Sequence, residues 1–240
     1  MDIEYIIKGI KENPVEQKGE IYHPIPFPEF EGLTTSSNPK GVYEKWDIIR
    51  KTLKSVYGNR QDLYVLDIGA NAGFYTFNFA KNGAKVKSFE CHDRYKTIGK
   101  EVAEVKKLAV EWIPKAFHSK SISTNEHFDL ALLLSVFQWM ANADINNKEA
   151  LDCLKLISEH SDYLFFELGY NSGKSCVKTN KLGHYAEMIR FLKKSTSYTH
   201  FKLIGKTRLW GSKKRYMILC SRNDKFEDSG WRVFLRKITF

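Results

Sequence analysis

Apolar positions along the chain repeat in two ways, one typical of helices and the other typical of buried strands. Between Val42 and Val56 they are spaced three and four residues apart, which predicts an amphipathic helix that ends near Gly58. Further along, short apolar runs alternate with helical spacing. We expect strands over 63–68, 85–90, 108–113, 128–134 and 162–168, and helices over about 72–82, 147–159 and 184–194, with one more helix that carries Ile98, Val102 and Val105.

This alternation of strands and helices predicts the class of fold. Successive strands joined by helices form a parallel sheet with helices on both faces. The last two apolar runs, 201–207 and 215–221, are separated by only seven residues, so they can pair only antiparallel. The prediction is an α/β domain whose seven-stranded sheet is mostly parallel and carries an antiparallel hairpin at its edge.

The first 41 residues differ from the rest of the chain. Pro24, Pro26 and Pro28 alternate with other residues, which forbids a helix there and favours extended backbone. We expect an irregular N-terminal extension or lid over 1–41, one domain over 42–222 and a tail over 223–240. The tail fits three interpretations: a packed appendage, a partner-binding segment, or the start of a longer region.

Composition agrees with one globular domain, since 42% of the 240 residues are hydrophobic and 28% are charged. The longest apolar run, 128–140, contains Asp129 and Gln138 and is shorter than the roughly 20 residues of a membrane span. The N-terminus has no secretory pattern, and the four cysteines lie far apart without metal-binding spacing. We therefore expect a cytoplasmic protein with reduced thiols, no membrane span and no structural metal.

Charge is distributed unevenly along the chain. The net charge is +10, but residues 172–240 hold 17 Lys and Arg against four Asp and Glu, while the preceding part is slightly acidic. Concentrated positive charge attracts anionic partners. A polyanionic or phosphorylated substrate is one interpretation of this third of the chain, and a solvated basic surface is the other.

The segment VLDIGANAGFYTF, from Val65 to Phe77, carries the strongest chemical signal. A buried strand ends near Asp67, a turn contains Gly69 and Gly73, and a helix follows. Glycine is needed in such a turn because ligand atoms approach the backbone too closely for a Cβ, and the N–H groups at the helix start face the ligand. The remaining loop positions that we expect to contact a cofactor are Ala70, Asn71 and Phe74.

Two cofactors compete for this loop. Dinucleotides require G-x-G-x-x-G, whereas this loop reads D-x-G-x-x-x-G. Asp67 can meet the ammonium group of a methionine moiety, but it would repel a pyrophosphate, so the loop favours S-adenosylmethionine (SAM) over NAD. Glu90 ends the next strand, where an acidic side chain accepts hydrogen bonds from ribose hydroxyls of either cofactor.

Further cofactor contacts are expected where the following strands end. Lys115, Ala116 and Phe117 follow the third strand and should border the adenine, with Cys91 beside Glu90. Phe117 would form a flat apolar wall there, although simple core packing also explains it. The fourth strand lies centrally and should place Leu134 and Ser135 beneath the cofactor.

Four segments in this order, VLDIGANAGFYTFNFAKNGAKV, FDLALLLSVFQWM, LFFELGYNSGK and FKLIGKTRLWGSKKRYMILCSR, resemble class I SAM-dependent methyltransferases. The nearest resemblance is to the methyltransferase module of bacterial O-antigen chain-terminating enzymes, which methylates a terminal phosphate on a polysaccharide. RNA 5′-phosphate capping methyltransferases share the pattern of the final strands. The resemblance extends over about residues 20–222 and implies a Rossmann-like sheet with SAM as cofactor.

The resemblance also implies roles for residues outside the glycine loop. Tyr22 and His23 stand where the polysaccharide family closes a Tyr-Gln pair over the cofactor, and Lys45 holds a basic position that contacts it. The sequence departs from the family in two respects: Gln138-Trp139 replaces a His-His pair after the fourth strand, and no kinase module follows.

Candidate catalytic and substrate-binding residues follow from the chemistry of methyl transfer. An anionic oxygen needs no base near neutral pH, whereas a hydroxyl would need one. Glu167 at the fifth strand tip and His184 after the next loop are the candidates for a base, beside His92, and each also has a purely structural interpretation. The basic side chains that we expect to bind a phosphate are Lys174, Lys178, Arg208 and Arg215.

The sequence therefore predicts a SAM-dependent methyltransferase whose partner is an anionic, phosphorylated saccharide or small molecule. An RNA methyltransferase is a second hypothesis, because the basic third of the chain also contains Trp210, Tyr216 and Trp231. A catalytically silent SAM-binding scaffold and an NAD oxidoreductase are the third and fourth hypotheses.

Overall fold

A computed structural model describes residues 2–13, 21–34, 39–142, 144–169, 185–208 and 214–222. Its centre is a seven-stranded sheet in the order β3-β2-β1-β4-β5-β7-β6. The first five strands are parallel, and β7 pairs antiparallel with both β5 and β6. This confirms the predicted fold class. The strands are β1 (Tyr64–Ile68), β2 (Lys85–Phe89), β3 (Val110–Ile113), β4 (Phe128–Leu134), β5 (Ser161–Glu167), β6 (His200–Arg208) and β7 (Lys214–Ser221).

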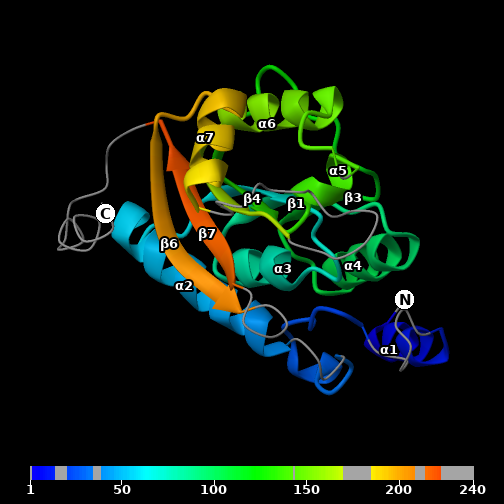
Figure 1. Cartoon of the computed structure of the whole chain (residues 1–240). Helices are drawn as coiled ribbons and strands as arrows, with labels where there is room; N and C mark the ends of the chain where they lie inside the picture. The colour runs from blue at the N-terminus through cyan, green and yellow to red at the C-terminus, as the bar shows by residue number, and fades with distance from the viewer. Residues whose placement is uncertain are drawn as a thin grey trace.

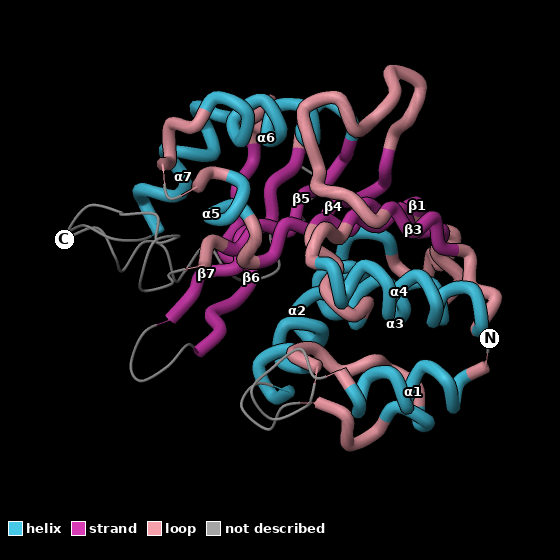
Figure 2. Tube along the Cα trace, turned by 90° about the vertical axis from the view of Figure 1, so that its right-hand side faces the viewer, coloured by secondary structure: helices cyan, strands magenta, loops and turns pink. Residues whose placement is uncertain are grey.

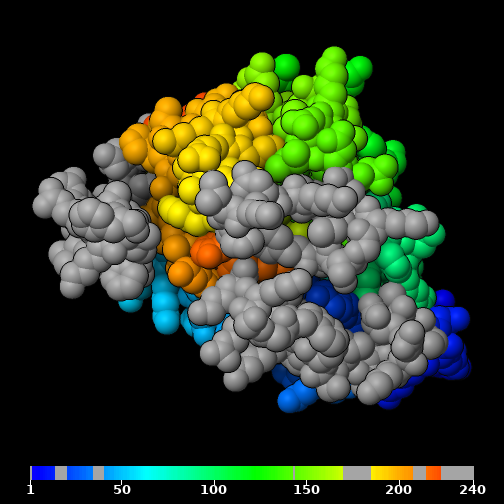
Figure 3. Space-filling view, in the orientation of Figure 1, coloured from blue at the N-terminus to red at the C-terminus, as the bar shows by residue number. Residues whose placement is uncertain are grey.

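Helices cover both faces of the sheet, as Figures 1 and 2 show from two directions. On one face lie α5, α6 and α7, and in the space-filling view α7 and the hairpin form one surface with α6 (Figure 3). On the other face lie α2, α3 and α4. The helices on the two faces are α2 (Pro39–Tyr57), α3 (Phe74–Lys81), α4 (Asp93–Val105), α5 (Phe137–Met140), α6 (Lys148–His160) and α7 (Tyr185–Ser195).

The central strands are apolar at nearly every position because both of their faces are covered. In β4, Leu130 and Leu132 pack with α2 and α3, whereas Ala131 and Leu133 pack toward α6 and α7. All four side chains are fully buried. The continuous run that identified this strand in the sequence is thus a consequence of its position between two helical layers.

The N-terminal region corrects the expectation that residues 1–41 are irregular, because α1 occupies Ile3–Glu12. The Asp2 side chain caps this helix by accepting a hydrogen bond from the Tyr5 N–H at 2.8 Å. Ile6 and Ile10 are buried in a cluster that includes α4, and Arg94 donates to the Gly9 carbonyl. The prolines farther along allow only a three-residue 3₁₀ turn, η1 (Pro28–Phe30).

The parallel strands position the functional region. Because β1 to β5 are parallel, their carboxyl ends share one edge of the sheet, and ligands of open α/β sheets bind outside that edge. None of the described helices has the length and apolar character needed to cross a bilayer.

Candidate functional site

A cavity of about 690 Å³ opens at this edge of the sheet. Its wall is formed by the loops after β1, β2, β3 and β4, by the N-terminal segment, by α2, α3, α4 and α6, and by β7. It brings together thirteen of the residues predicted from the sequence: Tyr22, His23, Lys45, Gly69, Asn71, Glu90, Cys91, Lys115, Ala116, Phe117, Leu134, Ser135 and Arg215.

The loop after β1 forms a bend of bare backbone in the cavity wall. Gly69 has φ +73° and Asn71 has φ +54°, and the N–H groups of Gly69 and Ala70 donate to the Phe89 carbonyl at 2.8 and 3.1 Å. A Cβ on Gly69 would lie 2.5 Å from Cγ2 of Val136. Glycine is therefore required at this position by both its backbone angle and the close approach of the loop after β4.

Glu90 presents a fixed carboxylate to the cavity from the end of β2. Its Oε2 accepts from the Asn71 N–H at 2.7 Å and its Oε1 accepts from the His92 N–H at 2.8 Å. The residue is only 8% exposed. A carboxylate has about four acceptor sites, so two backbone bonds fix its orientation and leave capacity for a ligand's hydroxyl groups.

Asp67 lies beneath the bend and is not part of the cavity wall that the described residues form. It is 2% exposed, and its Oδ2 accepts from the Thr76 hydroxyl at 2.6 Å. Burial raises the pKa of Asp67 to about 6, although the bond from Thr76 opposes that shift. A direct cofactor contact from Asp67 stays a prediction. Three other predicted contacts also lie outside this wall, namely Ala70, Gly73 and Phe74.

The loop after β3 borders the opposite side of the cavity. The Phe117 ring is 6% exposed and lies perpendicular to the Phe89 ring, with their centroids 5.1 Å apart. Phe117 also belongs to the core cluster beneath α6. It therefore combines both roles that the sequence allowed, as a wall of the cavity and as part of the core.

Glu167, at the end of β5, is the centre of a buried polar network. Its Oε1 accepts from Lys45 Nζ at 2.6 Å and from the Ser135 hydroxyl, while its Oε2 accepts from the Thr207 hydroxyl at 2.8 Å. Arg215 Nη1 lies 3.6 Å from Oε1 and donates to Ser135 Oγ at 3.0 Å. Burial alone would raise the pKa of Glu167, but Lys45, Ser135 and Arg215 outweigh it, and the pKa lies below its ordinary value.

His23 lies next to this network, and its backbone is fastened to the bend after β1. Its N–H donates to Asn71 Oδ1 at 3.3 Å, and its ring stacks on Tyr22 with centroids 4.9 Å apart. The Nδ1 atom is buried and has no hydrogen-bond partner among the described residues. Burial, reinforced by the charge of Lys45 and partly offset by Glu167, lowers the pKa of His23 to about 3. The imidazole is therefore neutral near pH 7.

Other predicted residues are not placed by the structure. His184, Lys174 and Lys178 lie outside the described residues, and so does the side chain of Arg208. Their roles stay predictions. His92, the remaining candidate base, lines the cavity beside Glu90.

Sequence reasoning missed Gln138 as a structural element of the site. This residue is fully buried, its Nε2 donates to the Ser135 carbonyl at 2.6 Å, and its Oε1 accepts from the Gly169 N–H at 3.1 Å. It thereby joins the ends of β4 and β5. The only signal in the sequence was that Gln138 departs from the His-His pair of the family that the chain resembles.

Comparisons with known proteins found similar folds among solved structures. No protein-family model and no curated protein sequence matches the chain. Among solved structures, the bifunctional kinase-methyltransferase WbdD matches with a TM-score of 0.65 and 22% identity over 92% of this chain and 46% of its own. The N-terminal domain of EvdMO1 with bound S-adenosylhomocysteine (SAH) matches with a TM-score of 0.60 and 14% identity over 92% of this chain and 97% of its own.

A further structure of that EvdMO1 domain, obtained in the presence of SAH and D-fucose, matches with a TM-score of 0.61 and 15% identity. The chain spans about half the length of the WbdD structures and nearly the whole of the EvdMO1 domain. These similarities show that the chain shares the α/β fold of methyltransferase domains.

Proposed function

We propose that the chain is a SAM-dependent methyltransferase that transfers a methyl group to an anionic acceptor, a phosphorylated saccharide or small molecule. The observation that carries the proposal is the cavity itself, in which the bare bend at Gly69 and the fixed carboxylate of Glu90 meet at the carboxyl edge of β1 and β2. The SAH bound in the similar EvdMO1 domain supports the same cofactor.

The residues of the cavity fit SAM part by part. Glu90 would accept hydrogen bonds from the ribose hydroxyls, and Phe117 would lie against the adenine. Tyr22 and His23, fastened to the bend through Asn71, would cover the methionine part. When bound, SAM supplies an electrophilic methyl group on a sulfonium. The chain's own residues hold the reactants in line and exclude water, and such positioning supplies roughly 7–11 kcal/mol.

An anionic acceptor is supported by two cations that meet at the end of β5. Lys45 and Arg215 both line the cavity and both approach the carboxylate of Glu167, whereas the acidic residues Glu90 and Glu149 line it from the end of β2 and from α6. The similar EvdMO1 domain was crystallised in the presence of D-fucose, which supports a saccharide as the carrier of the anion. Lys174, Lys178 and Arg208 remain predicted phosphate contacts, and His184 a predicted base.

Binding measurements test the cofactor assignment directly. Calorimetry should detect SAH binding to the purified chain and no comparable binding of NAD. Transfer of a labelled methyl group from SAM would then be followed with sugar phosphates, with neutral sugars and with a 5′-phosphorylated RNA. Methylation of a sugar phosphate supports the proposal, and methylation of RNA alone supports the RNA hypothesis. SAH binding without transfer to any acceptor supports a scaffold, and failure to bind SAH overturns the cofactor assignment itself.

A further inference from the structure

We propose that Lys45, Arg215 and His23 form an oxyanion-binding subsite for the methyl acceptor, built on the buried carboxylate of Glu167. The subsite would hold a phosphate or carboxylate group. This inference rests on the proposed function. It departs from the family resemblance for Lys45, which it assigns to the acceptor in place of the cofactor, and it gives His23 a contact with the acceptor in addition to its place over the methionine part. It also states in which protonation state the acceptor reacts.

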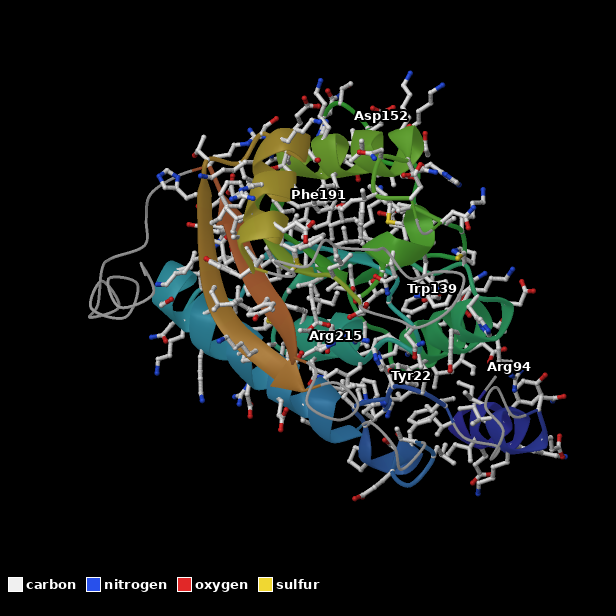
Figure 4. All side chains as sticks on the ribbon, viewed as in Figure 1. Tyr22, Arg94, Trp139, Asp152, Phe191 and Arg215 are labelled. Carbon is white, nitrogen blue, oxygen red and sulfur yellow. The ribbon has the colours of Figure 1, made fainter. Side chains whose placement is uncertain are left out.

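The two cations are close together because they approach the same oxygen atom. Lys45 Nζ lies 2.6 Å and Arg215 Nη1 lies 3.6 Å from Oε1 of Glu167. Their side chains are 13% and 10% exposed, and both line the cavity. Figure 4 shows Arg215, on the hairpin, pointing toward the region where Tyr22 enters from the N-terminal segment. An oxyanion bound beside this pair would receive charge-assisted hydrogen bonds from two cations.

The network also fixes the geometry of the cations. Thr207, on β6, donates to the other oxygen of Glu167, and the Ser135 hydroxyl lies between Arg215 and Oε1. Hydrogen bonds from β6 and from the loop after β4 therefore orient the carboxylate independently of the two cations. Arginine and lysine held in this manner lose little rotamer freedom when a ligand binds, which favours charge-assisted hydrogen bonds to an oxyanion.

His23 supplies the independent observation that a ligand group belongs here. Its Nδ1 is buried without a hydrogen-bond partner in the described part of the chain, and its ring interacts electrostatically with both Lys45 and Glu167. A buried polar atom without a partner is unfavourable, because it has lost its hydrogen bonds to water and gained none in return. A neutral imidazole with its proton on this nitrogen would donate to an acceptor oxyanion, which removes that cost.

The same contacts make Glu167 a positioning residue rather than the base. Both of its oxygens already accept hydrogen bonds, and the cations favour its ionised form. The acceptor then reacts through an oxygen that is already ionised. A lone pair of that oxygen forms the new O–C bond to the methyl group, the electron pair of the C–S bond returns to sulfur, and no proton is transferred.

Titration of inorganic phosphate into the purified chain saturated with SAH tests the subsite. We expect phosphate to bind the SAH complex, and Arg215→Gln and Lys45→Met to weaken its binding by about tenfold or more. Arg215→Lys should retain part of the affinity, and His23→Phe, which preserves a ring, should weaken it severalfold. The matched control is Arg50→Gln, because Arg50 pairs with Asp47 on the exposed face of α2.

The outcomes separate this inference from the proposed function. If SAH abolishes phosphate binding, the cations bind the cofactor's own carboxylate and the subsite is refuted. The subsite is also refuted if the Arg215→Gln variant binds phosphate as tightly as the unaltered chain. Arg215→Gln should leave SAH affinity within about twofold. If SAH itself fails to bind, the proposed function fails. Phosphate titration of the chain without SAH would still show whether Lys45 and Arg215 bind an oxyanion.

Discussion

Two carboxylates at neighbouring strand ends, Asp67 and Glu90, illustrate how environment separates residues of similar chemistry. Glu90 lines the cavity and accepts two backbone N–H bonds. Asp67 is buried beneath the bend, where burial raises its pKa to about 6. The first is prepared to bind a ligand directly, and the second carries an energetic cost near neutral pH that a bound cation would relieve.

Replacing Glu90 by alanine should weaken SAH binding by roughly tenfold to a hundredfold, because hydrogen bonds to a charged group contribute about 1.5–3 kcal/mol. The change also removes the acceptor for the Asn71 and His92 N–H groups. Calorimetry gives the affinity. Asp93→Ala is the matched control, since that carboxylate lies on the exposed first turn of α4 beside Lys96. Equal losses in both variants would refute the ribose assignment.

Asp67→Asn should stabilise the protein above about pH 6 and weaken SAH binding. The folded-state pKa of Asp67 exceeds its ordinary value, so its contribution to stability is fully present below about pH 4 and is lost as the pH rises through about 6. Asparagine does not ionise and therefore does not lose this stability. The gain in unfolding free energy should reach roughly 1–3 kcal/mol near pH 7. Thermal unfolding at pH values on both sides of this window measures it. A difference between the variants that does not change with pH would contradict the burial argument.

At the scale of elements, the bend after β1 depends on a contact with the loop after β4. Gly69→Ala should destabilise the fold by roughly 2–5 kcal/mol, because it combines a left-handed φ with a Cβ placed 2.5 Å from Val136. Gly58→Ala is the matched control, since Gly58 has φ +63° with nothing within 4 Å of its Cβ position. Denaturant unfolding should show the larger loss at Gly69. Adding Val136→Ala should recover the difference between the two variants, and no recovery would exclude crowding as its cause.

The docking of α1 is a second contact between elements. Ile10→Ala should cost about 2–4 kcal/mol in docking free energy, because the side chain is 1% exposed in the cluster beside α4. Tyr5→Ala on the same helix is the control, since Tyr5 is 63% exposed. Hydrogen exchange of the α1 amides should accelerate in the first variant alone. Unchanged exchange would mean that α1 is held by other contacts.

At the scale of the whole molecule, the fold could be predicted because local patterns encode it. A central strand such as β4 is a continuous apolar run, and its bounds, Phe128–Leu134, coincide with the prediction. The carboxyl-edge rule then located the cavity residues that lie at strand ends, whereas Tyr22, His23 and Lys45 were expected only from the family resemblance. The Asp2 cap and the Ile6–Ile10 spacing also signalled α1, but the prolines downstream dominated the interpretation of the whole N-terminal region.

The polar network could not be derived from such patterns. Lys45 and Glu167 are 122 residues apart in the sequence, and Ser135 and Arg215 are 80 apart. Their pairing depends on how α2, the loop after β4 and the hairpin approach β5, which no local periodicity records. Glu167 was therefore predicted as a base from its position at a strand tip, before the donors that occupy it were known.

The uneven charge of the chain leads to the last prediction. A chain with a net charge of +10 will bind RNA at low salt whatever its substrate, and that binding should fall by about a thousandfold or more between roughly 50 and 200 mM salt. Fluorescence anisotropy with a short 5′-phosphorylated RNA measures it. An acceptor recognised in the cavity behaves differently, because Arg215 and Glu167 are shielded from bulk ions. Two results together would identify RNA as the acceptor and contradict a saccharide phosphate. The RNA would stay bound at the higher salt, and its binding would be lost on addition of phosphate or in the Arg215→Gln variant.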